Sequence, residues 1–185
     1  QLNDVALDWS FAYPAATRAR SQPAVAAGAL FVGSHSGIVY AMDLDSGCVR
    51  WKFQANSEVR NAIVVESWEP GDKDANPRLF FGDMTGHQYA LEAFSGKLLW
   101  SKTMDEHPAV TLTAASALVD ETLYVPLSSL EEGSAISPMY PCCTFRGAVV
   151  ALDPDTGDEK WRRYFTGPSV ERGKNGAGAP SFGPA

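Results

Sequence analysis

Positive charge, cysteine and long apolar runs are all scarce in this sequence of 185 residues. Its 15 Lys and Arg are outnumbered by 22 Asp and Glu, and the formal net charge of -7 argues against nucleic acid or an anionic membrane surface as partner. No apolar run approaches the roughly 18 residues of a membrane-spanning helix. Three cysteines are too few for a disulfide scaffold. The opening Gln1 to Asp4 lacks a signal-peptide pattern, so we expect any leader to have been removed or to lie upstream.

An internal repeat is what the sequence has instead. Three segments align without gaps, and in each the two glycines are ten residues apart and a tryptophan follows the second glycine by four. Each copy is typical of two strands joined by a Ser-Gly or Thr-Gly turn. The segments are Gly37–Trp51, Gly86–Trp100 and Gly147–Trp161.

Two further apolar runs precede each repeat, so the predicted unit has four short strands. The innermost runs are 22–26, 60–65 and 113–119, and the second runs are 29–33, 78–82 and 122–126. Glycine interrupts every run and the periods are short, which excludes a helical fold. The sequence predicts an all-β protein, a partial β-propeller of about three four-stranded antiparallel blades. We expect the blades at residues 20–54, 58–104 and 110–165, with the end of a preceding blade at 1–15 and the start of the next at 167–185.

Two of the cysteines, Cys142 and Cys143, are adjacent and can close on each other only as a strained eight-membered ring. Ordinary disulfides join Cα atoms about 4.4–6.8 Å apart, whereas neighbours across a trans peptide lie about 3.8 Å apart. An oxidised pair would form a rigid sulfur plate and would indicate the periplasm or the cell exterior. Two reduced, buried cysteines acting as small hydrophobes, or half of a metal site, remain alternatives.

The third unit differs from the others in the loop between its second and third strands. The first two units have only Ser34-His35-Ser36 and Asp83-Met84-Thr85 there, whereas the third carries a long insertion that ends in the cysteine pair. Because strands in a blade alternate in direction, this loop opens on the same face as the start of the innermost strands. Long loops on a rigid scaffold are typical of binding sites. Other candidates at this face are Gln22, Glu58, Arg60, Thr111 and Thr113.

The repeated pattern Ala-x-Asp/Glu-x-x-Ser/Thr-Gly-x-x-x-Trp resembles the tryptophan-docking repeat of the pyrroloquinoline-quinone (PQQ) dehydrogenase-like propellers. In that family each tryptophan packs against the turn of the next blade, so the resemblance implies a structural role for Trp51, Trp100 and Trp161. Such propellers have about eight blades. By this resemblance the chain looks like a fragment of a longer protein.

The cysteine loop extends the resemblance. Quinoprotein alcohol dehydrogenases stack an adjacent-cysteine ring on one face of PQQ and place a nearby arginine at its carboxylates, and Cys142, Cys143 and Arg146 match these positions. The segment around the loop is most similar to the polyvinyl alcohol dehydrogenase branch. In the better-known alcohol dehydrogenases the pair lies between blades and further from its arginine, whereas here it lies within a blade. Arg60 is the predicted second partner of the carboxylates.

The resemblance implies a PQQ-dependent dehydrogenase with Ca²⁺ at the quinone, which oxidises alcohols, polyvinyl alcohol or other secondary alcohols among them, and passes electrons to cytochrome c. It matches no calcium ligand or catalytic residue within this chain, and we expect both after Ala185. The fragment alone is therefore expected to be inactive. The alternative is a non-catalytic propeller that serves as a protein-interaction scaffold.

The three histidines and the third cysteine are predicted to have structural roles. His35, His87 and His107 lack metal-ligand spacing and are predicted to be surface or turn residues. Cys48 follows a turn glycine and is predicted to pack beside the strand of Trp51.

Overall fold

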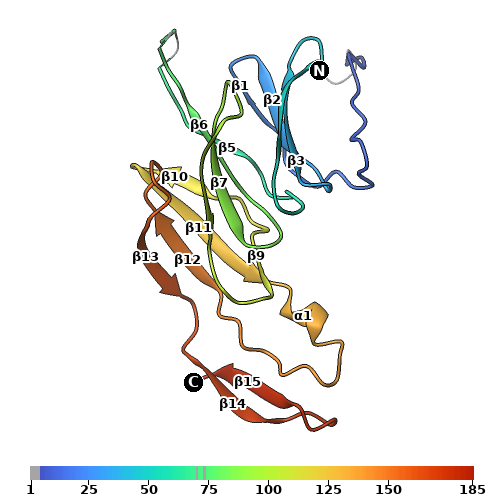
Figure 1. Ribbon diagram of the computed structural model, residues 1–185, viewed down its shortest axis with the longest axis vertical. Helices are drawn as coiled ribbons and strands as arrows, with labels where there is room; N and C mark the ends of the chain where they lie inside the picture. The colour runs from blue at the N-terminus through green and yellow to red at the C-terminus, as the bar shows by residue number, and fades with distance from the viewer. Residues whose placement is uncertain (1–4, 70, 73) are drawn as a thin grey trace.

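The computed structural model describes residues 5–69, 71–72 and 74–185 (Figure 1). The opening residues Gln1 to Asp4, which lack a signal-peptide pattern, lie outside the described residues. The described part is a succession of antiparallel sheets, which confirms the predicted all-β class. Its one helix is the four-residue α1 (Glu131–Ser134), and no helix among the described residues is long and apolar enough to cross a membrane.

Three of the sheets share one plan, in which four strands lie side by side in chain order. The first contains β1 (Ala24–Ala26), β2 (Ala29–Gly33), β3 (Ile38–Asp43) and β4 (Val49–Gln54). The second contains β5 (Val64–Val65), β6 (Arg78–Gly82), β7 (His87–Glu92) and β8 (Leu98–Thr103). The third contains β10 (Ala117–Val119), β11 (Thr122–Ser129), β12 (Ala148–Leu152) and β13 (Glu159–Tyr164).

Two further pairings lie beside the third sheet. The short β9 (Val110–Thr111) pairs with Ser128 and Ser129 at the end of β11, so the start of the third unit lies next to the start of the long insertion. The last two strands, β14 (Ser169–Lys174) and β15 (Pro180–Pro184), form a separate hairpin, drawn in red in Figure 1.

Each of the three sheets carries the same irregularity between its last two strands. An alanine lies opposite the repeat tryptophan, and the register shifts immediately after this pair. A bulge of this kind bends the strand and increases its twist. The three pairs are Ala41 with Trp51, Ala90 with Trp100 and Ala151 with Trp161.

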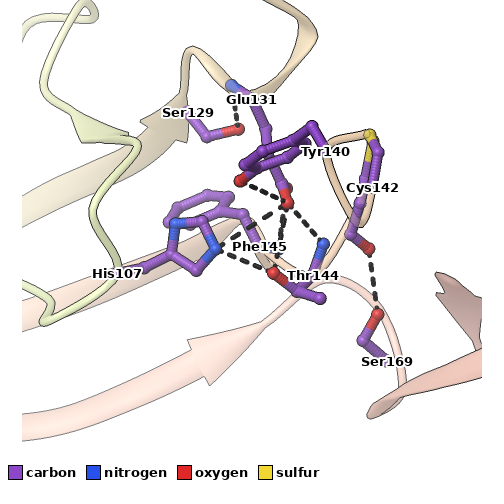
Figure 2. Close-up of a disulfide and its surroundings, with 9 residues drawn as sticks. His107, Ser129, Glu131, Tyr140, Cys142, Thr144, Phe145 and Ser169 are labelled. Carbon is purple, nitrogen blue, oxygen red and sulfur yellow. Dashed lines mark hydrogen bonds and ion pairs between the residues drawn. A yellow bond between two sulfur atoms is a disulfide. The ribbon is translucent and has the colours of Figure 1, made fainter. Parts of the chain in front are cut away.

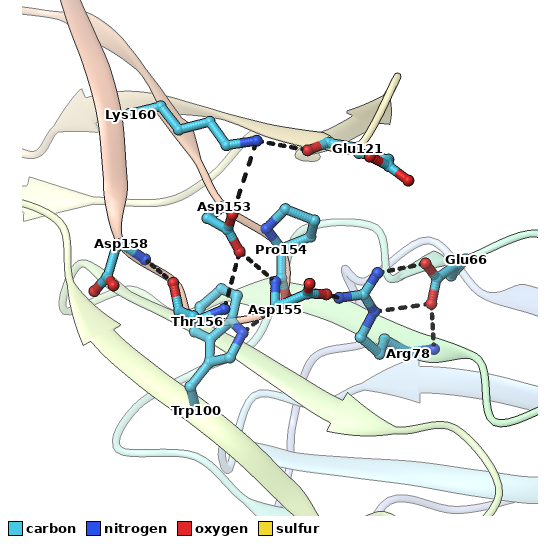
Figure 3. A network of polar contacts seen from close by, with 10 residues as sticks. All are labelled: Glu66, Arg78, Trp100, Glu121, Asp153, Pro154, Asp155, Thr156, Asp158 and Lys160. Carbon is cyan, nitrogen blue, oxygen red and sulfur yellow. Dashed lines mark hydrogen bonds and ion pairs between the residues drawn. The ribbon is translucent and has the colours of Figure 1, made fainter.

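The tryptophan of one sheet docks on the turn of the next. Trp100 Nε1 donates to the carbonyl oxygen of Pro154 at 2.9 Å, as Figure 3 shows. A Cβ at Gly157 would lie 2.7 Å from the Trp100 ring, and Gly157 has φ of 73°, so both space and backbone conformation require glycine. Trp51 contacts Gly96 in the same way. The repeat glycines are therefore docking positions as well as turn residues.

Apolar side chains fill the space between successive sheets. One cluster joins the first and second sheets around Phe31 and Phe81, and another joins the second and third around Phe80 and Val125. Charged contacts cross the second junction at its edge, where Arg78 pairs with both Glu66 and Asp155 (Figure 3). The sheets are thus stacked layers with a separate apolar cluster at each junction.

The structure differs from the sequence predictions at the innermost strands. The predicted runs 60–65 and 113–119 shorten to β5 and β10, because a strand at the edge of a sheet is paired on one side only and leaves the ladder easily. Cys48 was predicted to be packed, and this prediction is wrong: it is exposed, because it lies in the connection before β4 and not within the sheet.

The flanking segments also differ from expectation. Residues 7–11 form no strand, although Trp9 Nε1 donates to Leu44 O at 2.9 Å in the manner of the other docking tryptophans. Residues 167–185 were expected to lead into an inner strand, but the turn at Asn175 reverses the chain into the β14–β15 hairpin. The division into blades stays a prediction, with the three sheets lying inside the ranges 20–54, 58–104 and 110–165.

Candidate cofactor-binding loop

The insertion of the third sheet runs from the end of β11, through α1, to the start of β12 (Figure 1). Cys142 and Cys143 lie near its end and form a disulfide. In the disulfide neither sulfur is a free thiol or a thiolate. The two alternatives from the sequence, reduced cysteines and half of a metal site, therefore do not describe the pair in this form. Cys143 is exposed and Cys142 half-buried, so one side of the disulfide is open to a ligand.

The β14–β15 hairpin holds the disulfide from one side. The Phe182 amide donates to the carbonyl oxygen of Cys142 at 2.6 Å, and the Ser169 hydroxyl donates to that of Cys143 at 3.0 Å. Cys142 also forms a parallel bridge with Ser181. Both carbonyl groups of the pair are therefore satisfied by the hairpin, which restrains them.

A buried carboxylate holds the chain on the other side of the disulfide. Glu131, only 3% exposed, accepts hydrogen bonds from the amides of Thr144 at 2.6 Å and Phe145 at 2.8 Å (Figure 2). Burial alone would raise the pKa of Glu131, but the two amides, the Thr144 hydroxyl and the nearby His107 together hold the pKa below its usual value. Glu131 is therefore ionised at neutral pH.

His107, from the segment before β9, completes this contact. Its Nε2 lies 2.9 Å from Thr144 Oγ1 and 3.8 Å from Glu131 Oε1, and its ring meets the Phe145 ring edge-on. The sequence predicts that His107 is a surface or turn residue, but its side chain is only 17% exposed. It links the start of the third unit to the cysteine loop.

Arg146 follows the disulfide and shares a cavity with it. Its guanidinium lies over the Tyr164 ring at 3.8 Å, and Nη2 donates to Thr166 O at 2.7 Å. Arg146 Nε is buried and has no hydrogen-bond partner among the described residues. Cys143 and Arg146 both line a cavity of about 190 Å³ that the β14–β15 hairpin bounds.

The chemistry of the cavity wall suits a flat, acidic ring such as PQQ. The disulfide supplies a rigid surface, and Arg146 supplies a permanently charged guanidinium at the cavity wall. Its volume is smaller than the roughly 300–1,000 Å³ of complete ligand pockets. On its own, the cavity is therefore too small to enclose such a ligand.

The same region does not fit a calcium ion. Oxygen and sulfur atoms of Glu131, Cys142 and Cys143 lie within 4.8 Å of one another, but calcium takes 6–8 oxygen ligands. Glu131 is the one carboxylate of this group, and both its oxygens already accept amide hydrogen bonds. We assign no calcium ligand among the described residues.

Residues 6–182 match the family model for PQQ repeats, which is described as "Outer membrane protein assembly factor BamB". The chain belongs to this family of PQQ-type propellers. It is 39% identical over 180 residues to a polyvinylalcohol dehydrogenase of Sphingopyxis sp. (strain 113P3), which covers 97% of this chain and 27% of the relative. It is 30% identical over 171 residues to a lanthanide-dependent methanol dehydrogenase of Methylacidiphilum fumariolicum (strain SolV), covering 89% of this chain and 26% of the relative.

Solved structures show the same fold. The crystal structure of a quinohemoprotein alcohol dehydrogenase from Comamonas testosteroni superposes with a TM-score of 0.68 at 21% identity, over 89% of this chain and 24% of that one. This likeness confirms the partial propeller. The chain thus spans about a quarter of the length of the PQQ-type relatives that it matches.

Within this PQQ-type propeller the predicted site residues separate into two groups. Cys143 and Arg146 line one cavity, with Cys142 bonded to Cys143. Arg60 lies in the second unit, where its Nη1 is 4.0 Å from Met84 Sδ, and none of the cavities found among the described residues joins it to the disulfide. Its role at the cofactor stays a prediction.

Sequence reasoning missed Glu131. The only signal was the pair Glu131-Glu132 in the insertion, and no pattern distinguishes the buried residue from its exposed neighbour. The packing of α1 against the end of the loop decides which of the two is enclosed.

Proposed function

We propose that this chain forms the cofactor-supporting part of a PQQ-dependent dehydrogenase that oxidises alcohols. One observation carries the proposal: Cys143, bonded to Cys142 in the disulfide, and the permanently charged Arg146 line one cavity. A bound PQQ would supply the quinone that takes up the electrons of the alcohol.

In this proposal the chain's own residues bind and orient. The disulfide offers a flat surface for stacking, and Arg146 holds a carboxylate while its guanidinium is fixed on Tyr164. Arg60 would contact a second carboxylate. The catalytic base and the ligands of the implied Ca²⁺ would lie outside this chain, so 185 residues alone would be inactive.

The proposed substrate and electron acceptor are based on the relatives, and the proposed location is based on the disulfide. Polyvinyl alcohol or another secondary alcohol is the proposed substrate because two polyvinylalcohol dehydrogenases are 39% identical to this chain. Cytochrome c is the proposed electron acceptor, since one relative is a cytochrome c-linked methanol dehydrogenase subunit. A periplasmic or secreted location is proposed from the disulfide.

The test uses the whole protein that carries this chain. It is loaded with PQQ and Ca²⁺, freed of excess cofactor, and examined for quinone absorbance that an alcohol bleaches and for dye reduction. The double variant Cys142→Ser/Cys143→Ser should retain at least tenfold less PQQ. Cys48→Ser is the matched control, because Cys48 is the exposed free cysteine of the first sheet, and it should behave as the parent.

Two results would refute the proposal: no PQQ retained by the folded parent protein, or equal retention by the double variant and the parent. Circular dichroism of each variant establishes that the sheets are formed.

A second function has one observation in its favour. The matching family model is described as an outer-membrane protein assembly factor, which is consistent with a non-catalytic propeller that binds proteins. In that case the disulfide would only stiffen the loop, and the parent protein would retain no PQQ and reduce no dye with any alcohol.

A further inference from the structure

Glu131 is buried within a segment that is otherwise open to solvent. It is 3% exposed, whereas every residue from Glu132 to Met139 is exposed. An ionised carboxylate loses its hydration on burial, and this is tolerated only when hydrogen bonds replace the water. The partners of Glu131 therefore indicate what it does.

Those partners are concentrated on the chain just after the disulfide. Glu131 Oε1 accepts from the amide and hydroxyl of Thr144 at 2.6 and 3.1 Å and from the Tyr140 hydroxyl at 3.3 Å, and Oε2 accepts from the amide of Phe145 at 2.8 Å. Figure 2 shows these contacts converging on the carboxylate. The two amides are the first that follow Cys143 in the chain.

The backbone of the cysteine pair is thus held from both sides. Its two carbonyl groups accept from the β14–β15 hairpin, and the next two amides donate to Glu131. The hairpin contacts come from a separate two-stranded element, whereas Glu131 begins α1 directly after β11, a strand of the third sheet. Glu131 therefore ties the disulfide to the rigid part of the fold.

The second sheet uses the same arrangement where there is no cysteine. In its turn between β6 and β7, the fully buried Asp83 accepts from the amides of Thr85 at 2.9 Å and His87 at 3.0 Å and from the Tyr89 hydroxyl at 2.8 Å. A buried carboxylate that holds loop amides therefore occurs twice among the described residues, once at the cysteine pair and once away from it.

We propose that Glu131 is a positioning residue, which fixes the orientation of the Cys142–Cys143 disulfide through the amides of Thr144 and Phe145. The effect on PQQ rests on the function proposed above; the effect on the disulfide itself does not. Without this carboxylate the loop moves, and the disulfide becomes accessible to reductants and a poorer surface for a flat ligand.

The experiment compares Glu131→Ala, Glu131→Gln and the control Glu132→Ala in the whole protein that carries this chain. The first measurement, without PQQ or metal, is the rate at which dithiothreitol reduces the disulfide, followed by thiol labelling and mass spectrometry. The rate should rise about tenfold or more in Glu131→Ala and less in Glu131→Gln, whose amide oxygen still accepts one hydrogen bond. Glu132→Ala should match the parent.

The second measurement is the Kd for PQQ at saturating Ca²⁺, together with kcat and KM for an alcohol. Glu131→Ala should raise the Kd about tenfold and lower kcat, with the KM for alcohol unchanged. If the parent binds no PQQ, the proposed function fails, and the reduction rates alone decide the positioning role.

Two outcomes would overturn the inference. Equal reduction rates in all variants would show that Glu131 does not restrain the disulfide. Equal reduction rates with a weaker affinity for added Ca²⁺ in Glu131→Gln would assign the carboxylate to a metal instead. Should Glu131→Ala not fold, Glu131→Gln carries the test, because it keeps the size of the side chain.

Discussion

The turn of the second sheet and the insertion of the third sheet occupy the same position, between the second and third strands of a unit. In both, a buried carboxylate accepts hydrogen bonds from loop amides, but the two loops differ in length. In the turn, Asp83 holds the amides of Thr85 and His87 across three residues. In the insertion, Glu131 holds the amides of Thr144 and Phe145 across more than ten. The same chemistry closes a tight turn or anchors a long loop.

The first sheet gives the simplest version. Ser34, also buried, accepts the amide of Ile38 through its hydroxyl at 3.0 Å, without a carboxylate. A short turn needs only one polar side chain, because the adjoining strands supply the rest of its hydrogen bonds. The long insertion has no ladder of its own, so its ordering depends on a charged acceptor, which makes stronger hydrogen bonds.

Exchange of the insertion for the short turn should have the largest effect on function. Replacing residues 130–146 with Asp-Met-Thr should abolish PQQ retention in the whole protein. The third sheet should persist, because the β11–β12 pairing from Leu123 with Leu152 to Leu127 with Ala148 excludes the insertion, and loop closure costs only about 0.6 kcal/mol per doubling of length. Absorbance of retained PQQ and circular dichroism measure the two effects. Retention by the exchanged protein would contradict the role of the loop.

Removal of the turn carboxylate should have the largest effect on stability. Asp83→Ala leaves the amides of Thr85 and His87 and the hydroxyl of Tyr89 without their acceptor in a buried position, and should lower the free energy of unfolding by about 3 kcal/mol. Ser34→Ala, which affects one amide, should cost about 1 kcal/mol. Urea unfolding of both variants measures this. Equal costs would show that the carboxylate has no special role.

The smallest expected effect is a pH dependence that separates Glu131 from its amide analogue. Because the pKa of Glu131 is lowered in the folded protein, its contribution to stability is complete above the usual carboxyl pKa of about 4.3 and is lost as the pH falls through the folded value. Glu131→Gln cannot titrate. The difference in unfolding free energy between parent and variant should therefore shrink between pH 7 and pH 3, and a constant difference would contradict the assignment.

The repeated parts of the fold were predictable because the same local rules act three times. The glycine turns and the strands around them follow from spacing, whereas the docking of the tryptophans followed from the family resemblance, and β2, at Ala29–Gly33, matches its predicted run residue for residue. The innermost strands were predicted too long, since pairing on one edge limits them in a way that composition does not reveal.

The candidate cofactor-binding loop was predictable only where its residues form a local motif. Cys142, Cys143 and Arg146 are visible as a local motif, and two of them line one cavity. Glu131 and His107 reach the loop from 13 and 37 residues away along the chain, counted to Thr144, and no local pattern pairs them. Contacts of this kind depend on how α1 and the segment before β9 pack.

Local sequence signals were enough for the layered β architecture and for the position of the adjacent cysteines, because turn glycines, strand periodicity and neighbouring cysteines act over a few residues. Only the tertiary structure decided that Glu131 rather than Glu132 is enclosed, that the final residues fold back as a hairpin on the disulfide, and that Arg146 stacks on Tyr164. Burial and long-range hydrogen bonds arise when sheets pack, and packing joins residues that the chain order keeps apart.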